Sequence, residues 1–170
     1  MTKPENSKPA PVYMTPACAE RLRGELREIL YKLRPEMADT AAWAAGNGDR
    51  SENADYHYAK RKLRQFDGRI RFLSKRLEEA FVVDPVEQKS IANGRVLFGC
   101  TVTVENEAGE EKLFSIVGTD EFDAGRGRVS WTSPIGRALL GSSQGDVVSF
   151  VAPGGHTELE VIKVEYKPID

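Results

Sequence analysis

The feature that most constrains the fold is a pair of apolar repeats, one on each side of a glycine-containing turn. The second repeat has intervals of 3, 4, 3, 4, 3, 4 and 3, through Tyr56, Ala59, Leu63, Phe66, Ile70, Leu73, Leu77 and Ala80. The first has similar spacing, through Leu22, Leu26, Ile29, Leu33, Met37, Ala41 and Ala44. Apolar residues at this spacing line one side of a helix. Two such helices joined by the short turn at 46–48 bury their apolar sides by folding back, which predicts an antiparallel coiled-coil hairpin over residues 13–84.

The ends of the first helix carry recognisable signals. Thr15 followed by Pro16 is typical of an N-cap and a first helical residue. Pro35 lies inside the repeat and lacks an N–H, so we expect a kink or a local break there. An arm of about 30 residues would be roughly 45 Å long at ~1.5 Å per residue.

The turn between the two helices is acidic. Residues 48–56 read GDRSENADY and place Asp49, Glu52 and Asp55 close together. Asp49 and Glu52 fit a capping box, and carboxylates three residues apart can also offer oxygen atoms to a hard cation on one side of a helix start. Both interpretations stay open from spacing alone. Because Mg²⁺ prefers six oxygen ligands, two carboxylates predict no lasting metal site on this chain by itself.

The second helix is strongly basic. Between residues 60 and 76, one acid, Asp67, stands among eight cations: Lys60, Arg61, Lys62, Arg64, Arg69, Arg71, Lys75 and Arg76. These cations could pair with Glu20, Glu25 and Glu28 of the first helix. They could equally follow a phosphate backbone. The excess of cations over acids favours the nucleic-acid interpretation.

The periodicity changes to two near residue 84, which predicts a linker at 85–92 and a second domain over residues 93–170. Strands are expected at 101–104, 113–117, 127–131, 147–151 and 158–165, with a hairpin turn at 106–109. Ser133, Pro134 and Gly141 bound one short helix at 135–140. The fold class is therefore α+β: the helical hairpin followed by a small sheet with one helix.

Composition excludes several classes of protein. The chain has 170 residues and a net charge of −2, and no apolar run approaches the length of a membrane span. Cys18 and Cys100 stand alone, so neither a zinc site nor a disulfide framework is indicated, and we expect a cytoplasmic protein with a disordered tail at 1–12. His57 and His156 lack partners at catalytic spacing. Because the apolar residues that form the seam between the two helices bury one another within the hairpin, a monomer is expected.

The chain resembles a known family. The tip run at 48–56, the flanking Trp43, the basic runs at 60–64 and 71–78, and the segment SPIGRALLG at 133–141 are similar to the bacterial Gre-type transcript cleavage factors, in particular the GreB branch. The similarity extends over roughly residues 13–167. Arg50 after the tip aspartate, together with the extent of the basic stripe, favours the GreB branch over the GreA branch.

The resemblance implies an FKBP-like C-terminal domain that binds RNA polymerase and a coiled coil that enters the polymerase's secondary channel. Asp49 and Glu52 would then help hold the polymerase's weakly bound second Mg²⁺ and position the attacking water, while Asp55 stays structural. The polymerase itself would cleave the RNA. The 3′ segment of the backtracked transcript would lie along Lys60, Arg61, Arg64, Arg71 and Lys75.

The resemblance also implies that Ser133, Pro134 and Arg137 contact the polymerase. Two places depart from the family's pattern. Gly46 and Asn47 replace a bulkier pair before the tip, and Trp131 and Thr132 stand where an acidic residue is expected. Two other functions remain open: a channel-binding regulator that does not activate cleavage, and a general coiled-coil nucleic-acid binder or chaperone-like module.

Overall fold

The computed structural model describes residues 10–170, and Arg50 by its backbone alone. These residues form two compact units: 19–79 make one, and 10–18 together with 80–170 make the other. The tail expected at 1–12 lies outside the described residues as far as position 9, and Val12 begins a strand. In the part of the chain described, no helix is both long and apolar enough to cross a membrane.

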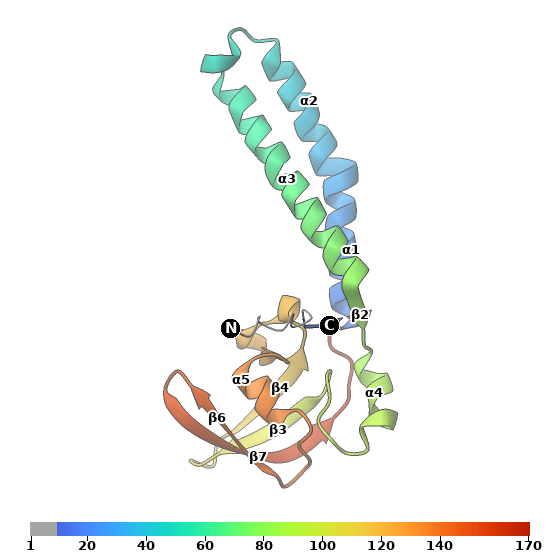
Figure 1. Cartoon of the computed structure of the whole chain (residues 1–170), viewed down its shortest axis with the longest axis vertical. Helices are drawn as coiled ribbons and strands as arrows, with labels where there is room; N and C mark the ends of the chain where they lie inside the picture. Colours follow the sequence, from blue (N-terminus) through green and yellow to red (C-terminus); the bar gives the residue numbers. More distant parts are fainter. Residues whose placement is uncertain (1–9) are drawn as a thin grey trace, which may run out of the picture. The chain divides into compact units, whose positions relative to one another are not determined.

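The first unit is the expected antiparallel helical hairpin (Figure 1). One arm runs through α1, η1 and α2, and the other is α3; their bounds are Pro16–Glu28, Ile29–Leu33, Arg34–Ala45 and Ala54–Glu79. The apolar repeat faces inward as predicted, because every seam position is buried or half-buried. Ile29, Ala41, Ala44, Ala59 and Leu73 are the most deeply enclosed of them.

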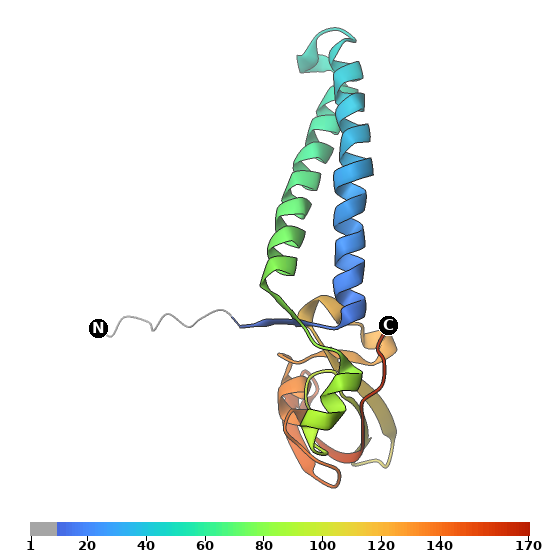
Figure 2. The same ribbon diagram turned by 90° about the vertical axis from the view of Figure 1, so that its right-hand side faces the viewer.

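The hydrogen-bond ladder of the first arm is locally interrupted just before Pro35, as expected, but the arm continues because the turn there widens. Residues Ile29–Leu33 are π-helical, and the Arg34 N–H donates to the Ile29 carbonyl, five residues back. Pro35 then lies in the first turn of α2, where a missing N–H costs nothing. The wider turn allows the arm to continue (Figure 2), as π-turns inside helices commonly do.

Two ion pairs join the arms outside the apolar seam. Arg34 Nε lies 2.7 Å from Asp67 Oδ1, and Arg69 Nε and Nη2 donate to the two oxygens of Glu25 at 2.6 and 2.9 Å. These bonds hold the pKa of both carboxyls below their usual values. Asp67, the single acid of the basic stretch, is therefore already occupied by the opposite arm.

The second unit is built on a five-stranded sheet in the order β5-β4-β3-β7-β6. The strands are β3 Thr101–Asn106, β4 Glu111–Val117, β5 Arg128–Ser130, β6 Val147–Ala152 and β7 Gly155–Glu165. Leu139 of helix α5, Pro134–Leu139, belongs to the same buried apolar cluster as Val102, Val104 and Val161 of the central strands. The prediction of a helical hairpin followed by a small α+β domain is confirmed.

Residues 85–92, expected to be a linker, instead form helix α4, Pro85–Ala92. The Asp84 side chain accepts from Val86 N at 2.9 Å, and Pro85 and Ala92 are buried. An N-cap followed by proline at the first helical position therefore overrode the polar composition that suggested a linker.

The sequence also gave no sign of a two-stranded parallel sheet. Strand β1, Val12–Met14, pairs with β2, Ala80–Val82. The first of these precedes α1 and the second follows α3, so the chain enters and leaves the hairpin through neighbouring strands. Both strands belong to the unit that contains the large sheet.

A buried carboxylate fixes the start of α1 within that same unit. Glu121, in the short helix η3, Thr119–Glu121, accepts from Thr15 N at 3.1 Å, from the Thr15 hydroxyl, and from Gly118 N at 3.0 Å. Thr15 in turn accepts from Cys18 N at 3.3 Å, which is the N-cap expected from the sequence. One acidic side chain thus joins segments 106 residues apart.

Candidate functional site

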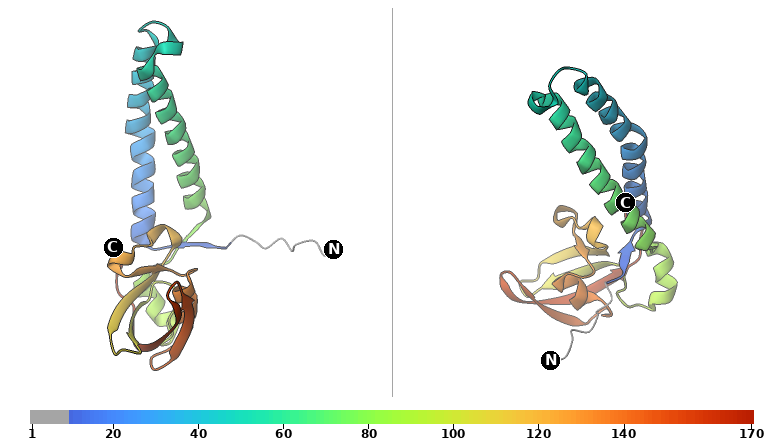
Figure 3. Two further views of the ribbon diagram at one scale, coloured as in Figure 1. Left: turned by 90° about the vertical axis from the view of Figure 1, so that its left-hand side faces the viewer. Right: turned by 45° about the horizontal axis from the view of Figure 1, so that its top comes forward.

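The acidic turn lies at the end of the hairpin, between α2 and α3, and Figure 3 shows it from two further directions. Helix α2 ends at Ala45 with Gly46 as its C-cap, and Gly48 has a φ of 112°, a backbone conformation that favours glycine. Residues Arg50–Glu52 then form a single 3₁₀ turn, η2, before α3 begins at Ala54. Gly48 thus lets the chain reverse direction within a few residues.

Asp49 and Glu52 lie on the same turn. The Glu52 N–H donates to the Asp49 carbonyl at 3.3 Å, and in such a turn side chains three residues apart point to the same side. Both residues are exposed. The structure therefore places on one short turn the two acidic residues that the sequence singled out, and leaves both exposed.

Asp49 is held in place by its own turn. Its Oδ1 accepts from Ser51 N at 3.0 Å, and this hydrogen bond holds the pKa of the Asp49 carboxyl below its usual value. The carboxylate therefore stays charged at neutral pH. Asp49 thus acts as a cap for the 3₁₀ turn rather than for α3.

The residue that caps α3 is Asn53. Its Oδ1 accepts from Tyr56 N at 3.0 Å, and its Nδ2 donates to the Ala44 carbonyl at the end of α2. The capping box with Asp49 as the cap of the long helix is therefore wrong, because Asn53 fills that position four residues later. Asp55 lies in the first turn of α3, where a carboxylate interacts favourably with the helix dipole.

The acidic residues at the tip are better suited to share a metal ion with a partner than to bind one alone. Within residues 10–170, no group of three or more His, Cys, Asp or Glu side chains could enclose a metal. Asp49 and Glu52 offer carboxylate oxygens, which Mg²⁺ prefers, but two residues leave most of an octahedral shell unfilled. The remaining ligands would have to come from a partner.

The basic residues form one face of α3. Lys60, Arg61, Arg64, Arg71 and Lys75 fall within roughly a third of the helix circumference at 3.6 residues per turn, on the side away from the seam. All five are exposed, and in the described chain none of them makes a hydrogen bond or ion pair. Arg71 lies close enough to Asp67 to contribute to its lowered pKa.

Pairing with acids of the first arm explains little of this charge. Of the three glutamates considered for it, Glu25 pairs with Arg69, whereas Glu20 contacts Arg23 and Arg27 of its own arm. The five residues of the basic face stay available for an outside partner. A row of uncompensated cations on a helix is suited to phosphate groups.

The segment expected to contact a protein partner lies at the start of α5. Ser133 caps this helix by accepting from Gly136 N at 3.1 Å and donates to the Ser130 carbonyl at 2.6 Å. Pro134 and Arg137 are exposed beside it. The Thr132 hydroxyl hydrogen-bonds Ser130 at 2.8 Å, so it stabilises the turn where an acidic residue was expected.

An aromatic cluster next to this segment was not found from the sequence. The Tyr13 ring lies 5.1 Å from Trp131, 5.7 Å from Phe98 and 6.0 Å from Phe81, measured between ring centroids. A groove of about 510 Å³ runs beside these rings, past Leu97 and Leu140. Because its residues come from five separate stretches of chain, no local pattern could have revealed it.

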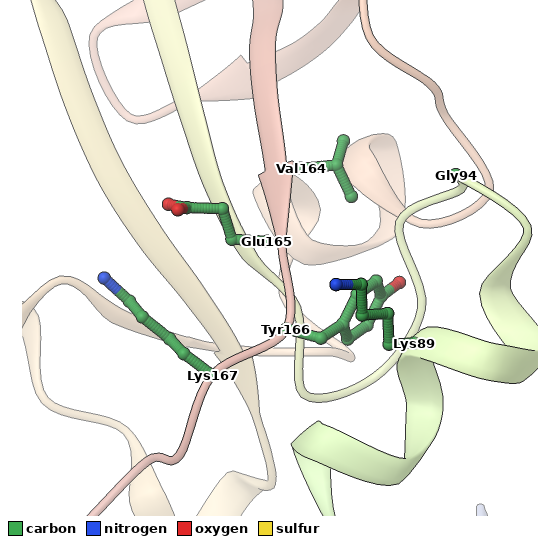
Figure 4. A pocket seen from close by; sticks show the side chains of 6 residues that line it. All are labelled: Lys89, Gly94, Val164, Glu165, Tyr166 and Lys167. Atoms are coloured by element: carbon green, nitrogen blue, oxygen red, sulfur yellow. The ribbon is translucent and has the colours of Figure 1, made fainter.

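A second pocket of about 360 Å³ lies between α4 and the end of β7 (Figure 4). The Tyr166 hydroxyl in its wall accepts from Leu97 N at 2.9 Å and donates to the Arg95 carbonyl. Burial raises the pKa of Tyr166 to about 12, so this hydroxyl keeps its proton. Its use in fixing the 95–97 loop indicates a structural role for this pocket.

Comparison with known families gives matches over both units. The family model described as transcription elongation factor, N-terminal, matches residues 12–82. The model described as transcription elongation factor, GreA/GreB, C-terminal, matches residues 91–166. Together they span nearly all of the described chain.

Individual relatives agree with these matches. Transcription elongation factor GreB of Neisseria meningitidis serogroup B is 48% identical over 158 residues, covering 93% of this chain and 96% of the relative. Transcription elongation factor GreA of Ralstonia nicotianae is 43% identical, covering 87% and 93%. Among solved structures, GreA factor homolog 1 (Gfh1) of Thermus thermophilus is 26% identical with a TM-score of 0.41, covering 92% and 99%.

Proposed function

Since the chain belongs to the GreA/GreB family of transcription elongation factors, we propose that it binds RNA polymerase and stimulates the polymerase's own cleavage of backtracked RNA. The observation that supports this most is the pair of exposed carboxylates, Asp49 and Glu52, on one turn at the end of a long hairpin. The chain is then an activator of another enzyme rather than an enzyme itself.

The proposed mechanism divides the work between the two units. The globular unit docks on the polymerase through Ser133, Pro134 and Arg137, and the hairpin enters the secondary channel. Helix α3 has 26 residues, which gives a length of about 39 Å, so the tip lies at the far end of a long helix from the base of the hairpin.

At the polymerase active centre, Asp49 and Glu52 supply ligand oxygens and orient the attacking water. A Mg²⁺ ion that these residues helped to hold there would lower the pKa of that water and stabilise the charge that develops on the leaving oxygen. The bond from Ser51 N lowers the pKa of the Asp49 carboxyl and so favours its ionised form further. The tip would thus supply ligands to an ion that it cannot enclose by itself.

The basic face of α3 holds the extruded 3′ segment of the transcript. Its five cations meet one phosphate per nucleotide and need no base sequence, so binding is electrostatic and depends on salt. Each phosphate that they neutralise releases counterions, which favours binding at low ionic strength.

The carboxylate role is tested by Asp49→Asn and Glu52→Gln in a backtracked-complex cleavage assay with purified polymerase and Mg²⁺. Asn at position 49 can still accept from Ser51 N, so the turn is retained while the charge is lost. Each variant should slow stimulated cleavage by at least about a hundredfold, the scale of losing one catalytic electrostatic group. Binding to polymerase should stay within about twofold.

Asp39→Asn is the matched control, because Asp39 is another exposed aspartate on the same hairpin. It should cleave like the parent protein. Full activity in both tip variants would refute the proposed mechanism. Tight polymerase binding without any stimulated cleavage by the parent protein would favour the non-activating channel regulator instead.

The basic face is tested by the double variant Arg61→Gln, Arg64→Gln. Stimulation should fall between about 50 and 200 mM salt, but less steeply in the variant than in the parent protein. The difference in slope should correspond to about two phosphate contacts. The control is Arg23→Gln, Arg27→Gln, which removes the same charge from the other arm, where Glu20 is the partner. Equal salt dependence in the two double variants would mean that the basic face is an ordinary solvated surface that does not bind RNA.

A further inference from the structure

The loop that carries the two carboxylates has little packing to hold its shape. Apart from Ala45, which is half-buried, its residues up to Glu52 are exposed wherever their side chains are described. A Cβ added at Gly48 would meet no atom within 4 Å. Hydrogen bonds, rather than apolar contacts, must therefore set the position of Asp49 and Glu52.

Most of these hydrogen bonds are local. Gly46 N and Asn47 N donate to carbonyls three residues back, at 3.1 and 3.0 Å. Ser51 N and Glu52 N donate to Asp49, two and three residues back. Such bonds shape each side of the loop but do not fix one side against the other.

The Asn53 side chain joins the two sides. Its Nδ2 donates to the Ala44 carbonyl, nine residues back, while its Oδ1 caps α3 through Tyr56 N. The same carboxamide is thus bonded to the last turn of α2 and to the first turn of α3. Asn53 is half-buried, and Ala44 and Ala59 are fully buried beside the two helix ends.

We propose that Asn53 is a positioning residue. Its side-chain hydrogen bonds to the Ala44 carbonyl and to Tyr56 N fix the turn from which Asp49 and Glu52 supply ligands to a shared metal ion. This proposal rests on the proposed function, since fixing the turn matters for cleavage only if those carboxylates act as metal ligands. The donor half of the carboxamide is the decisive part. A cap alone would need only an oxygen.

Asn53→Asp and Asn53→Ser separate the two halves. Aspartate and serine cap helices about as well as asparagine, so Tyr56 N keeps its acceptor. An ionised aspartate has no donor, and serine is too short to cap α3 and reach Ala44 together. Using both variants distinguishes loss of the donor from the added charge of aspartate.

The first measurement is amide hydrogen exchange in the free, full-length protein. In both variants the Tyr56 amide should stay as protected as in the parent, whereas the Ser51 and Glu52 amides should exchange about fivefold faster, the effect of losing one net hydrogen bond. The control is Asn106→Ser, which makes the same change at a turn in the other unit. It should leave the tip amides unchanged.

The second measurement is the Mg²⁺ concentration that gives half-maximal stimulated cleavage. We expect it to rise about fivefold in Asn53→Asp and Asn53→Ser, with polymerase binding unchanged. Unchanged tip exchange, or faster exchange with an unchanged Mg²⁺ requirement, would overturn the positioning role. If Asp49→Asn also cleaves normally, the proposed function itself fails, which distinguishes the two failures.

Discussion

At the scale of single residues, two polar side chains determine how distant parts of this chain meet. Asn53 bonds the end of one helix to the start of the next, and Glu121 bonds Thr15 to the loop at Gly118. Each satisfies backbone N–H or C=O groups that would otherwise lack partners at a helix end or in a buried loop. Polar groups in such positions are costly to remove, because their partners stay behind.

Replacing Glu121 with alanine should therefore destabilise the globular unit. The change leaves Thr15 N and Gly118 N without their acceptor in a buried site, at a cost of about 2–4 kcal/mol. Urea denaturation followed by tryptophan fluorescence measures it, since Trp131 lies in the same unit.

The control for this change is Glu111→Ala, an exposed glutamate at the start of β4. It should shift the free energy of unfolding by less than about 0.5 kcal/mol. A similar loss of stability in the two variants would show that the buried hydrogen bonds contribute nothing specific.

At the scale of elements, the long helices contain glycines that their backbone geometry does not require. Gly68 lies in the middle of the basic face of α3, and a Cβ there would meet only the Arg71 guanidinium, at 3.9 Å. Gly24 in α1 has no atom within 4 Å of such a Cβ. Neither has a positive φ, so alanine fits both positions without strain.

Gly68→Ala and Gly24→Ala should each stabilise the hairpin by about 1 kcal/mol, the difference in helix propensity. Amide exchange of seam residues such as Leu73 measures the effect, and the salt dependence of the basic face should not change. Gly48→Ala is the contrasting variant, because its φ of 112° disfavours alanine and it should loosen the tip. Destabilisation by Gly68→Ala would contradict this account of the helix.

How far the sequence predicts each element depends on how local its signal is. The hairpin was predictable because a heptad repeat is visible within a few turns, and so were β3 and β4 around the turn at 106–109. Strands β1 and β2 have three residues each and are stable only as a pair, so neither shows a pattern alone. At the tip, Asp49 and Asn53 are both good caps, and the Ala44 carbonyl, which no local pattern reveals, favours Asn53.

At the scale of the whole molecule, the globular unit is discontinuous in sequence. Residues 10–18 belong to it together with 80–170, and the hairpin is inserted between them. Met14 and Cys18 are fully buried there, and Tyr13 contacts three aromatic rings of the same unit. The boundary between the two units therefore does not coincide with the change of periodicity near residue 84.

A chain in which residues 19–79 are replaced by about eight glycine and serine residues should fold into the globular unit. Residues 80–170 alone should be less stable by at least about 2 kcal/mol, the scale of burying one side chain such as Met14. Denaturant unfolding of the two chains tests this difference. Equal stability would mean that residues 10–18 are not an essential part of that unit.

The parallel pairing of β1 with β2 also has a consequence for synthesis on the ribosome. Strand β1 leaves the ribosome before either of its partners: Ala80 follows Val12 by 68 positions, and Glu121 follows Thr15 by 106. The hairpin has its whole seam available first, because its contacts lie within 19–79. During translation we therefore expect the hairpin and its acidic tip to fold early. The globular unit, which is proposed to bind the polymerase, should complete its folding only when the last strands emerge.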